Sequence, residues 1–124
     1  MTRLLNDYIG VFTQRSEHIK NAVNRCVEYW APEQVPLILL LSTVGKALIK
    51  QLDVLSENEK TVLFQHIEDG MRSDEDELAT AVATGLVESL VTASDGNDEL
   101  WRAIERYLGR ESNKHAVAWK NFGQ

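Results

Sequence analysis

The sequence predicts an all-α protein, an irregular antiparallel bundle of about six helices in a single domain over residues 1–124. Apolar residues recur at spacings of three and four along most of the chain, and no segment shows the period-two alternation of a half-buried strand. The connections between the expected helices are short, which favours antiparallel neighbours. Residues 36–70 and 73–109 each have the form helix, turn, helix, so a stack of two α-hairpins is the alternative architecture.

The segment from Ser73 to Ala93 is expected to be the central helix of the domain. From Leu78 onward it is apolar on almost every side, and only a narrow stripe of polar residues at a spacing of four interrupts it. A helix with so little polar surface is surrounded by other helices. Ser73 is expected to cap its start, and the four acids from Asp74 to Glu77 follow where the helix dipole favours negative charge.

The first half of the chain predicts two amphipathic helices. Apolar residues between Leu4 and Trp30 place the first over residues 2–29, with a weaker apolar face around residues 13–18 that leaves a break there open. Pro32 and Pro36 end this helix because proline disfavours helix in the residue before it. Pro36 can then open a second helix that extends to about Leu52.

Local capping patterns predict the remaining helices. Ser56 and Glu59 form a capping box that starts a helix ending at Gly70, a suitable left-handed C-cap. Asn97 or Asp98 caps a fifth helix that ends at Gly109. Ser112 is expected to cap a short last helix.

Two glycines fall in the middle of expected helices, Gly45 and Gly85. A glycine at such a position costs about 1 kcal/mol relative to alanine. We therefore expect another helix to approach closely at both places.

The charge is distributed unevenly. Residues 53–99 contain thirteen acids and two bases, a net charge of −11, whereas residues 1–52 and 100–124 have net charges of +2 and +3. An acidic region of this kind repels nucleic acid and speeds encounter with a basic protein. Within this region the acids are most closely spaced between residues 68 and 77. We expect these acids to contact such a partner: Glu68, Asp69, Asp74, Glu75, Asp76 and Glu77.

The sequence contains no pattern typical of an enzyme, a cofactor site or a metal site. His18, His66 and His115 are isolated from other ligands, and Cys26 is the sole cysteine, so a zinc site built on cysteines is excluded. The acids near Gly70 lack the order of a calcium loop. With neither a signal peptide nor a membrane span in the sequence, we expect a cytoplasmic location.

Part of the sequence resembles a family of small all-helical bacterial immunity proteins from polymorphic and contact-dependent growth inhibition toxin systems. The resemblance lies in Gly70–Val91, in the segment V-P-L-I-L-L-L-S from Val35 and in W-x-x-I-x-x-Y-L-G-x-E-S from Trp101. It covers about residues 35–122 and transfers neither catalytic nor binding residues. It implies a cytoplasmic protein that binds a cognate toxin domain, commonly a basic nuclease.

The leading hypothesis is therefore an immunity protein that blocks the active site or substrate groove of a toxin. Its acids would imitate phosphate charge and pair with lysine and arginine of the toxin. The alternative is a helical adaptor or scaffold that forms a homo-oligomer through the flat face of its first helix. The basic stripe of Arg102, Arg106 and Arg110 is expected to be a solvated outer face, because the acidic net charge opposes nucleic-acid binding.

Overall fold

The computed structural model describes residues 3–122, which form seven helices and contain no strand. The all-α bundle expected from the sequence is confirmed. One of the seven, which we call the central helix, is continuous and consists of three consecutive segments, α5, η1 and α6. The elements are α1 (Arg3–Arg15), α2 (Glu17–Trp30), α3 (Leu37–Gln51), α4 (Glu57–Met71), α5 (Asp76–Ala81), the π-helical segment η1 (Val82–Val87), α6 (Glu88–Ala93), α7 (Asp98–Glu105) and α8 (Arg110–Asn121).

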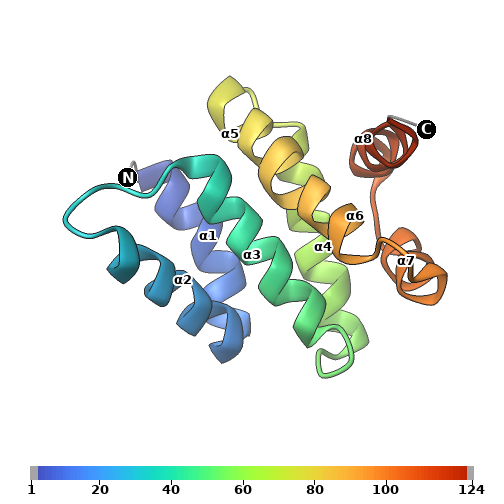
Figure 1. Cartoon of the computed structure of the whole chain (residues 1–124), viewed down its shortest axis with the longest axis horizontal. Helices are drawn as coiled ribbons and strands as arrows, with labels where there is room; N and C mark the ends of the chain where they lie inside the picture. Colours follow the sequence, from blue (N-terminus) through green and yellow to red (C-terminus); the bar gives the residue numbers. More distant parts are fainter. Residues whose placement is uncertain (1–2, 123–124) are drawn as a thin grey trace.

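The helices form an irregular arrangement around the central helix. Figure 1 shows α2, α3 and the central helix side by side, with α1 and α4 behind them. The two last helices, α7 and α8, are seen nearly end-on, so their axes cross those of the other helices. Helix α8 packs against α4, η1 and α6. The central helix thus has neighbours on several sides, as its apolar composition requires.

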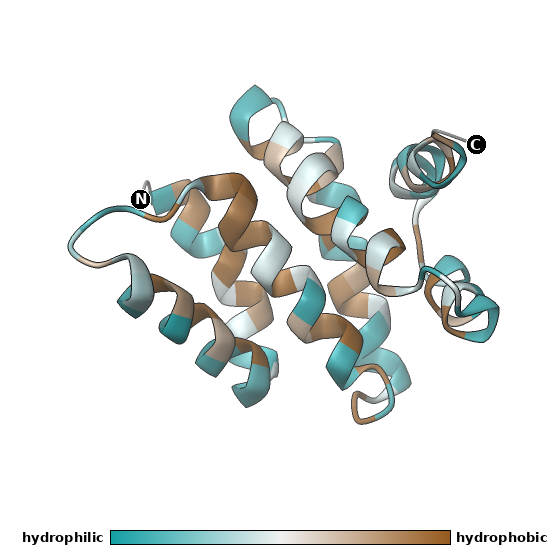
Figure 2. Ribbon diagram, in the orientation of Figure 1, coloured by the Kyte–Doolittle hydropathy of each residue, from teal (hydrophilic) through white to brown (hydrophobic). Residues whose placement is uncertain are grey.

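The core draws on the whole bundle. Buried apolar side chains from α1 through α8 form one cluster, and Figure 2 shows the most apolar ribbon on α3. The largest side chains without exposed surface come from α1 to α4 and from the central helix and α7: Phe12, Ile19, Leu40, Leu41, Leu48, Leu63, Phe64, Ile67, Leu86, Leu90 and Ile104. Within residues 3–122 no helix is both long enough and apolar enough to cross a membrane.

The first expected helix is broken at Ser16 into α1 and α2. The hydroxyl of Ser16 accepts a hydrogen bond from the Ile19 N–H at 3.2 Å, which caps the start of α2. The break falls inside the weaker stretch of the apolar face and allows both halves to bury their apolar sides. Residue 2, the expected first residue of this helix, lies outside the described part of the chain.

Some capping predictions are confirmed and others are wrong. The capping box at Ser56 and Glu59 is present, and the side chain of Asn97 accepts the Leu100 N–H at 3.1 Å. Ser73 does not cap the central helix: its hydroxyl accepts the N–H of Glu75 in a local turn, and α5 begins only at residue 76. Ser112 is buried inside the first turn of α8 and does not precede it.

Gly70 and Gly109 differ from their expected role as helix stops. Gly70 lies within α4 without a positive φ, and it is glycine because the ring of Tyr8 occupies the space that a Cβ would need. Gly109 precedes α8 as its N-cap residue, whereas α7 ends four residues earlier. Within residues 3–122 the only glycine with a positive φ is Gly96, in the turn between α6 and α7.

Gly45 and Gly85 mark the close approach of α3 and the central helix, as expected. A Cβ on Gly85 would lie 2.5 Å from the carbonyl oxygen of Ile38, and one on Gly45 would lie 2.9 Å from that of Leu86. Each helix therefore contributes a glycine that meets the backbone of the other. Because both helices run in the same direction (Figure 1), the approach brings their first turns to the same end of the molecule.

Replacement of Gly85 by alanine tests this approach. Alanine is the better helix former by about 1 kcal/mol, yet we expect Gly85→Ala to lower the free energy of unfolding by about 1–3 kcal/mol, because the methyl group would collide with the α3 backbone. The matched control is Gly10→Ala in α1, where the nearest atom to a new Cβ is 3.9 Å away. Chemical denaturation should show Gly10→Ala to be neutral or stabilising; a stabilised Gly85→Ala variant would contradict the packing.

Candidate functional site

The first turn of α3 exposes apolar side chains. Helix α3 has no acidic residue in its first turn and no side-chain cap after Pro36. Leu37 is half-buried, and Ile38 keeps 45% of its surface exposed. Figure 2 shows this turn as a strongly apolar end of the helix. The apolar run that begins at residue 35 thus includes side chains that do not pack fully into the core.

The start of the central helix has the opposite character. Asp74 and Glu75 lie in the turn after α4, and Asp76 and Glu77 form the first turn of α5. All four side chains are exposed. We call these four residues the acidic turn. Within residues 3–122, none of the four forms a salt bridge with a basic side chain, including those of the basic stripe on α7 and α8.

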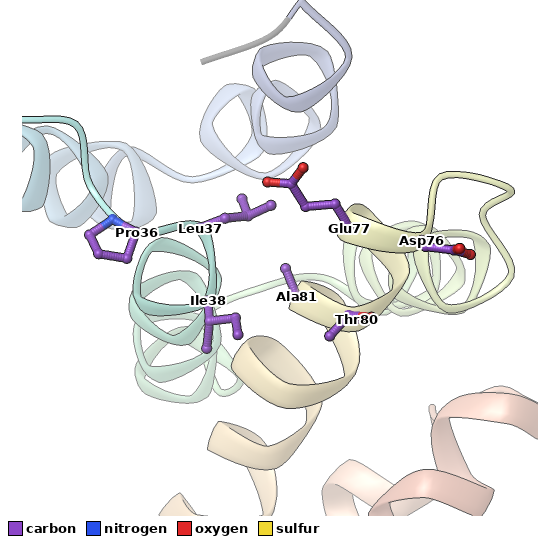
Figure 3. Close-up of a pocket in the computed structure, with 7 residues that line it drawn as sticks. All are labelled: Pro36, Leu37, Ile38, Asp76, Glu77, Thr80 and Ala81. Carbon is purple, nitrogen blue, oxygen red and sulfur yellow. The ribbon is translucent and has the colours of Figure 1, made fainter.

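A groove lies where these two helix starts meet. It has a volume of about 480 Å³ and is lined by Pro36, Leu37, Ile38, Asp76, Glu77, Thr80 and Ala81. In Figure 3 the carboxylate of Glu77 extends toward Leu37 across the groove, whereas that of Asp76 points to the other side of α5. The groove therefore combines an apolar wall from α3 with the carboxylate of Glu77.

A second hollow continues from the groove toward α1. Its volume is about 280 Å³, and it is lined by Leu5, Gln34, Val35, Pro36, Leu37 and Glu77. The two hollows share Pro36, Leu37 and Glu77 and therefore adjoin. Together they form an elongated depression over the starts of α1, α3 and α5.

Glu68 lies apart from the exposed acids, in the interface of α4 and α8. Its carboxylate accepts hydrogen bonds from the N–H groups of Glu111 and Ser112 and from the Ser112 hydroxyl, each at 2.9 Å. Burial alone would raise the pKa of Glu68, but the hydrogen bonds to its ionised form outweigh burial and hold the pKa below its ordinary value of 4.5. Glu68 therefore caps the start of α8 from another helix and is not available to a partner.

The role of Glu68 also explains two neighbouring residues. Helix α8 has no side-chain cap of its own, so its first N–H groups need an acceptor from elsewhere. A Cβ on Gly109 would lie 2.5 Å from a carboxylate oxygen of Glu68, so only glycine leaves room for this contact. No local pattern in the sequence links residues 68 and 112, which is why this role was missed.

The other expected site residue on α4, Asp69, is exposed at the surface. Its carboxylate accepts a hydrogen bond from the side chain of Gln65 at 3.0 Å, one turn earlier in the same helix. It lines neither hollow beside the acidic turn. Of the six acids expected from the sequence, Asp76 and Glu77 line the groove, and Asp74 and Glu75 precede them in the same turn.

Two of the three histidines and the cysteine have structural contacts. The ring of His66 stacks on Tyr8, and its Nε2 lies 2.8 Å from the Tyr8 carbonyl oxygen. His115 Nε2 lies 2.9 Å from a carboxylate oxygen of Glu88. Cys26 is half-buried and accepts a weak hydrogen bond from Thr43. Among the described residues no group of three or more histidine, cysteine or acidic side chains could hold a metal ion.

No protein-family model, curated protein or solved structure matches this chain.

Replacement of Glu68 by glutamine tests its role as a structural cap. We expect Glu68→Gln to lower the free energy of unfolding at pH 7 by about 1–3 kcal/mol, because hydrogen bonds to a buried charge are lost or weakened. A carboxyl group with a lowered pKa stabilises the fold above its unfolded pKa and loses this effect as the pH falls through its folded pKa. The difference between wild type and variant should therefore shrink below about pH 4.5.

The control is the adjacent exposed residue. Asp69→Asn should change the free energy of unfolding by less than about 0.5 kcal/mol at any pH tested, as is usual for surface substitutions. Urea titrations at several pH values measure both variants. Equal stability of Glu68→Gln and wild type at pH 7, or a difference that grows on acidification, would show that Glu68 is not the cap.

Proposed function

We propose that this chain is an inhibitor that binds a basic protein domain through its acidic turn, as an immunity protein binds its toxin. The observation that supports this most is the exposure of the four carboxylates of the acidic turn without a basic partner among residues 3–122. Four like charges in sequence repel one another, and a helix start needs fewer of them. A complementary positive surface on another protein would relieve this repulsion.

The acidic turn would act mainly on the rate of association. Complementary charges steer two proteins together and raise the association rate in a way that falls with ionic strength. A nuclease toxin carries lysine and arginine side chains where it holds the phosphates of its substrate. The acidic turn would occupy those side chains and so exclude the substrate. The proposed inhibitor would act in the cytoplasm of the cell that makes the toxin.

Self-association is a second candidate, and exposed aromatic side chains at the end of α8 support it. Trp119 and Phe122 stack with ring centroids 5.7 Å apart, and they keep 39% and 77% of their surfaces exposed. Two exposed aromatic rings side by side are typical of a contact surface. Light scattering on the isolated chain separates the candidates, because a stable homodimer favours the adaptor and a monomer favours the inhibitor.

The inhibitor proposal is tested by rescue of growth. The protein domain encoded immediately upstream of this chain's gene would be expressed in a bacterial host, alone and together with the chain. We expect the domain to stop growth when alone and the chain to restore it. A harmless upstream domain, or a toxic one that the chain does not neutralise, would contradict the proposal.

The role of the acidic turn is tested by charge reversal in the same system. The variant Asp74→Lys, Asp76→Lys, Glu77→Lys should associate with the domain at least about tenfold more slowly at low salt, with a weaker salt dependence. The control reverses three exposed acids elsewhere, Asp53, Asp95 and Glu105, and so changes the net charge equally. Surface plasmon resonance at two salt concentrations measures both, and equal effects of the two variants would exclude the acidic turn from the interface.

A further inference from the structure

We infer that the groove beside the acidic turn receives the apolar face of an amphipathic helix of the partner, with lysine or arginine side chains flanking that face. This inference rests on the proposed function and adds the mode of recognition. The acidic turn alone explains steering by charge; the groove supplies a place where apolar side chains of the partner can be buried.

The shape of the groove suits a segment of protein. Its volume is about 480 Å³, and the adjoining hollow of about 280 Å³ extends it toward α1. A helix lies in such a groove with apolar residues at positions i, i+3, i+4 and i+7 directed into it.

The walls of the groove define the chemistry of the occupant. Leu37 and Ile38 offer apolar surface from α3, and Ala81 offers a small buried side chain on the opposite helix. Glu77 extends its carboxylate across the groove toward Leu37, so a basic side chain next to an apolar one would meet this carboxylate. An acidic segment would be repelled, and a purely basic one would leave the apolar wall in contact with water.

The edge of the groove also disfavours a second copy of this chain. The chain has a net charge of −6, and a copy that docked its own acidic region here would bring like charges together. Helix α8, which exposes Lys114 beside Val117, also combines apolar and basic residues. Docking of α8 from a second copy is therefore one outcome that the experiment must detect.

The experiment uses three synthetic peptides and the full chain. The first peptide is a helix of about 18 residues with leucine at the four spaced positions and lysine between them, since shorter isolated helices are marginal in water. The second replaces leucine by serine, and the third replaces lysine by glutamate. Binding is followed by isothermal titration and by the NMR signals of the methyl groups of Leu37 and Ile38.

We expect the leucine–lysine peptide to bind at least tenfold more tightly than the serine–lysine peptide and to shift both methyl signals, while the leucine–glutamate peptide does not bind. Thr80→Trp, which fills the groove from an exposed position, should weaken binding of the first peptide at least tenfold and leave the serine–lysine peptide unaffected. Ile38→Ser, which removes part of the apolar wall, should act in the same direction. Thermal unfolding of both variants verifies that they fold.

Two results would overturn the inference. Equal affinities of the leucine–lysine and serine–lysine peptides, with Thr80→Trp and Ile38→Ser without effect, would show that charge alone attracts basic segments; the proposed function would stand. Methyl shifts of Leu37 and Ile38 that depend on protein concentration without peptide would assign the groove to a second copy. Failure of both lysine peptides to bind would count against the groove, whereas the rescue of growth tests the inhibitor independently.

Discussion

The structure depends on the close approach of α3 and the central helix at Gly45 and Gly85. Each glycine meets the backbone of the other helix, at 2.9 Å from Leu86 and 2.5 Å from Ile38 for an added Cβ, so neither position accepts a side chain without a shift. The two helices run in the same direction, and their first turns consequently lie together (Figure 1). One first turn is apolar and the other is acidic, and the groove exists because this packing brings them side by side. The glycines that allow α3 and the central helix to pack closely thus also bring together the two sides of the groove.

Several acids of residues 53–99 have side-chain partners within the molecule, and those of the acidic turn have no basic partner in the described part of the chain. Glu68 caps α8, Glu57 accepts the hydroxyl of Tyr107 and pairs with Lys60, and Glu88 lies against His115. The regional charge of −11 therefore overstates the surface available to a partner, and the position of each carboxylate matters more than the total.

Many local features of the chain were predictable from sequence, although the caps expected at Ser73 and Ser112 and the helix stops expected at Gly70 and Gly109 were wrong. Most contacts between distant helices were not predictable. The helices, the break near Ser16, the caps at Ser56 and Asn97 and the close approach at the two mid-helix glycines follow from spacing and capping chemistry. Glu68 caps α8 by hydrogen bonds to Glu111 and Ser112, which follow it in the sequence by 43 and 44 residues. A contact over such a separation produces no periodic pattern in the sequence. The groove was not predicted for a similar reason: exposed Ile38 lines a groove only because the start of α5 packs beside the start of α3. The π-helical turn of η1 was also not indicated by the apolar pattern, which is equally compatible with a regular α-helix.

In the proposed function, a basic partner docks where the starts of α3 and α5 meet. Amide hydrogen exchange of the full chain, alone and bound to the domain encoded upstream, tests this docking because it reports contact along the whole backbone. We expect slower exchange on binding at residues 37–39 and 74–81, with little change in α7. Slower exchange confined to residues 110–121, around the exposed rings of Trp119 and Phe122, with the two helix starts unaffected, would contradict it.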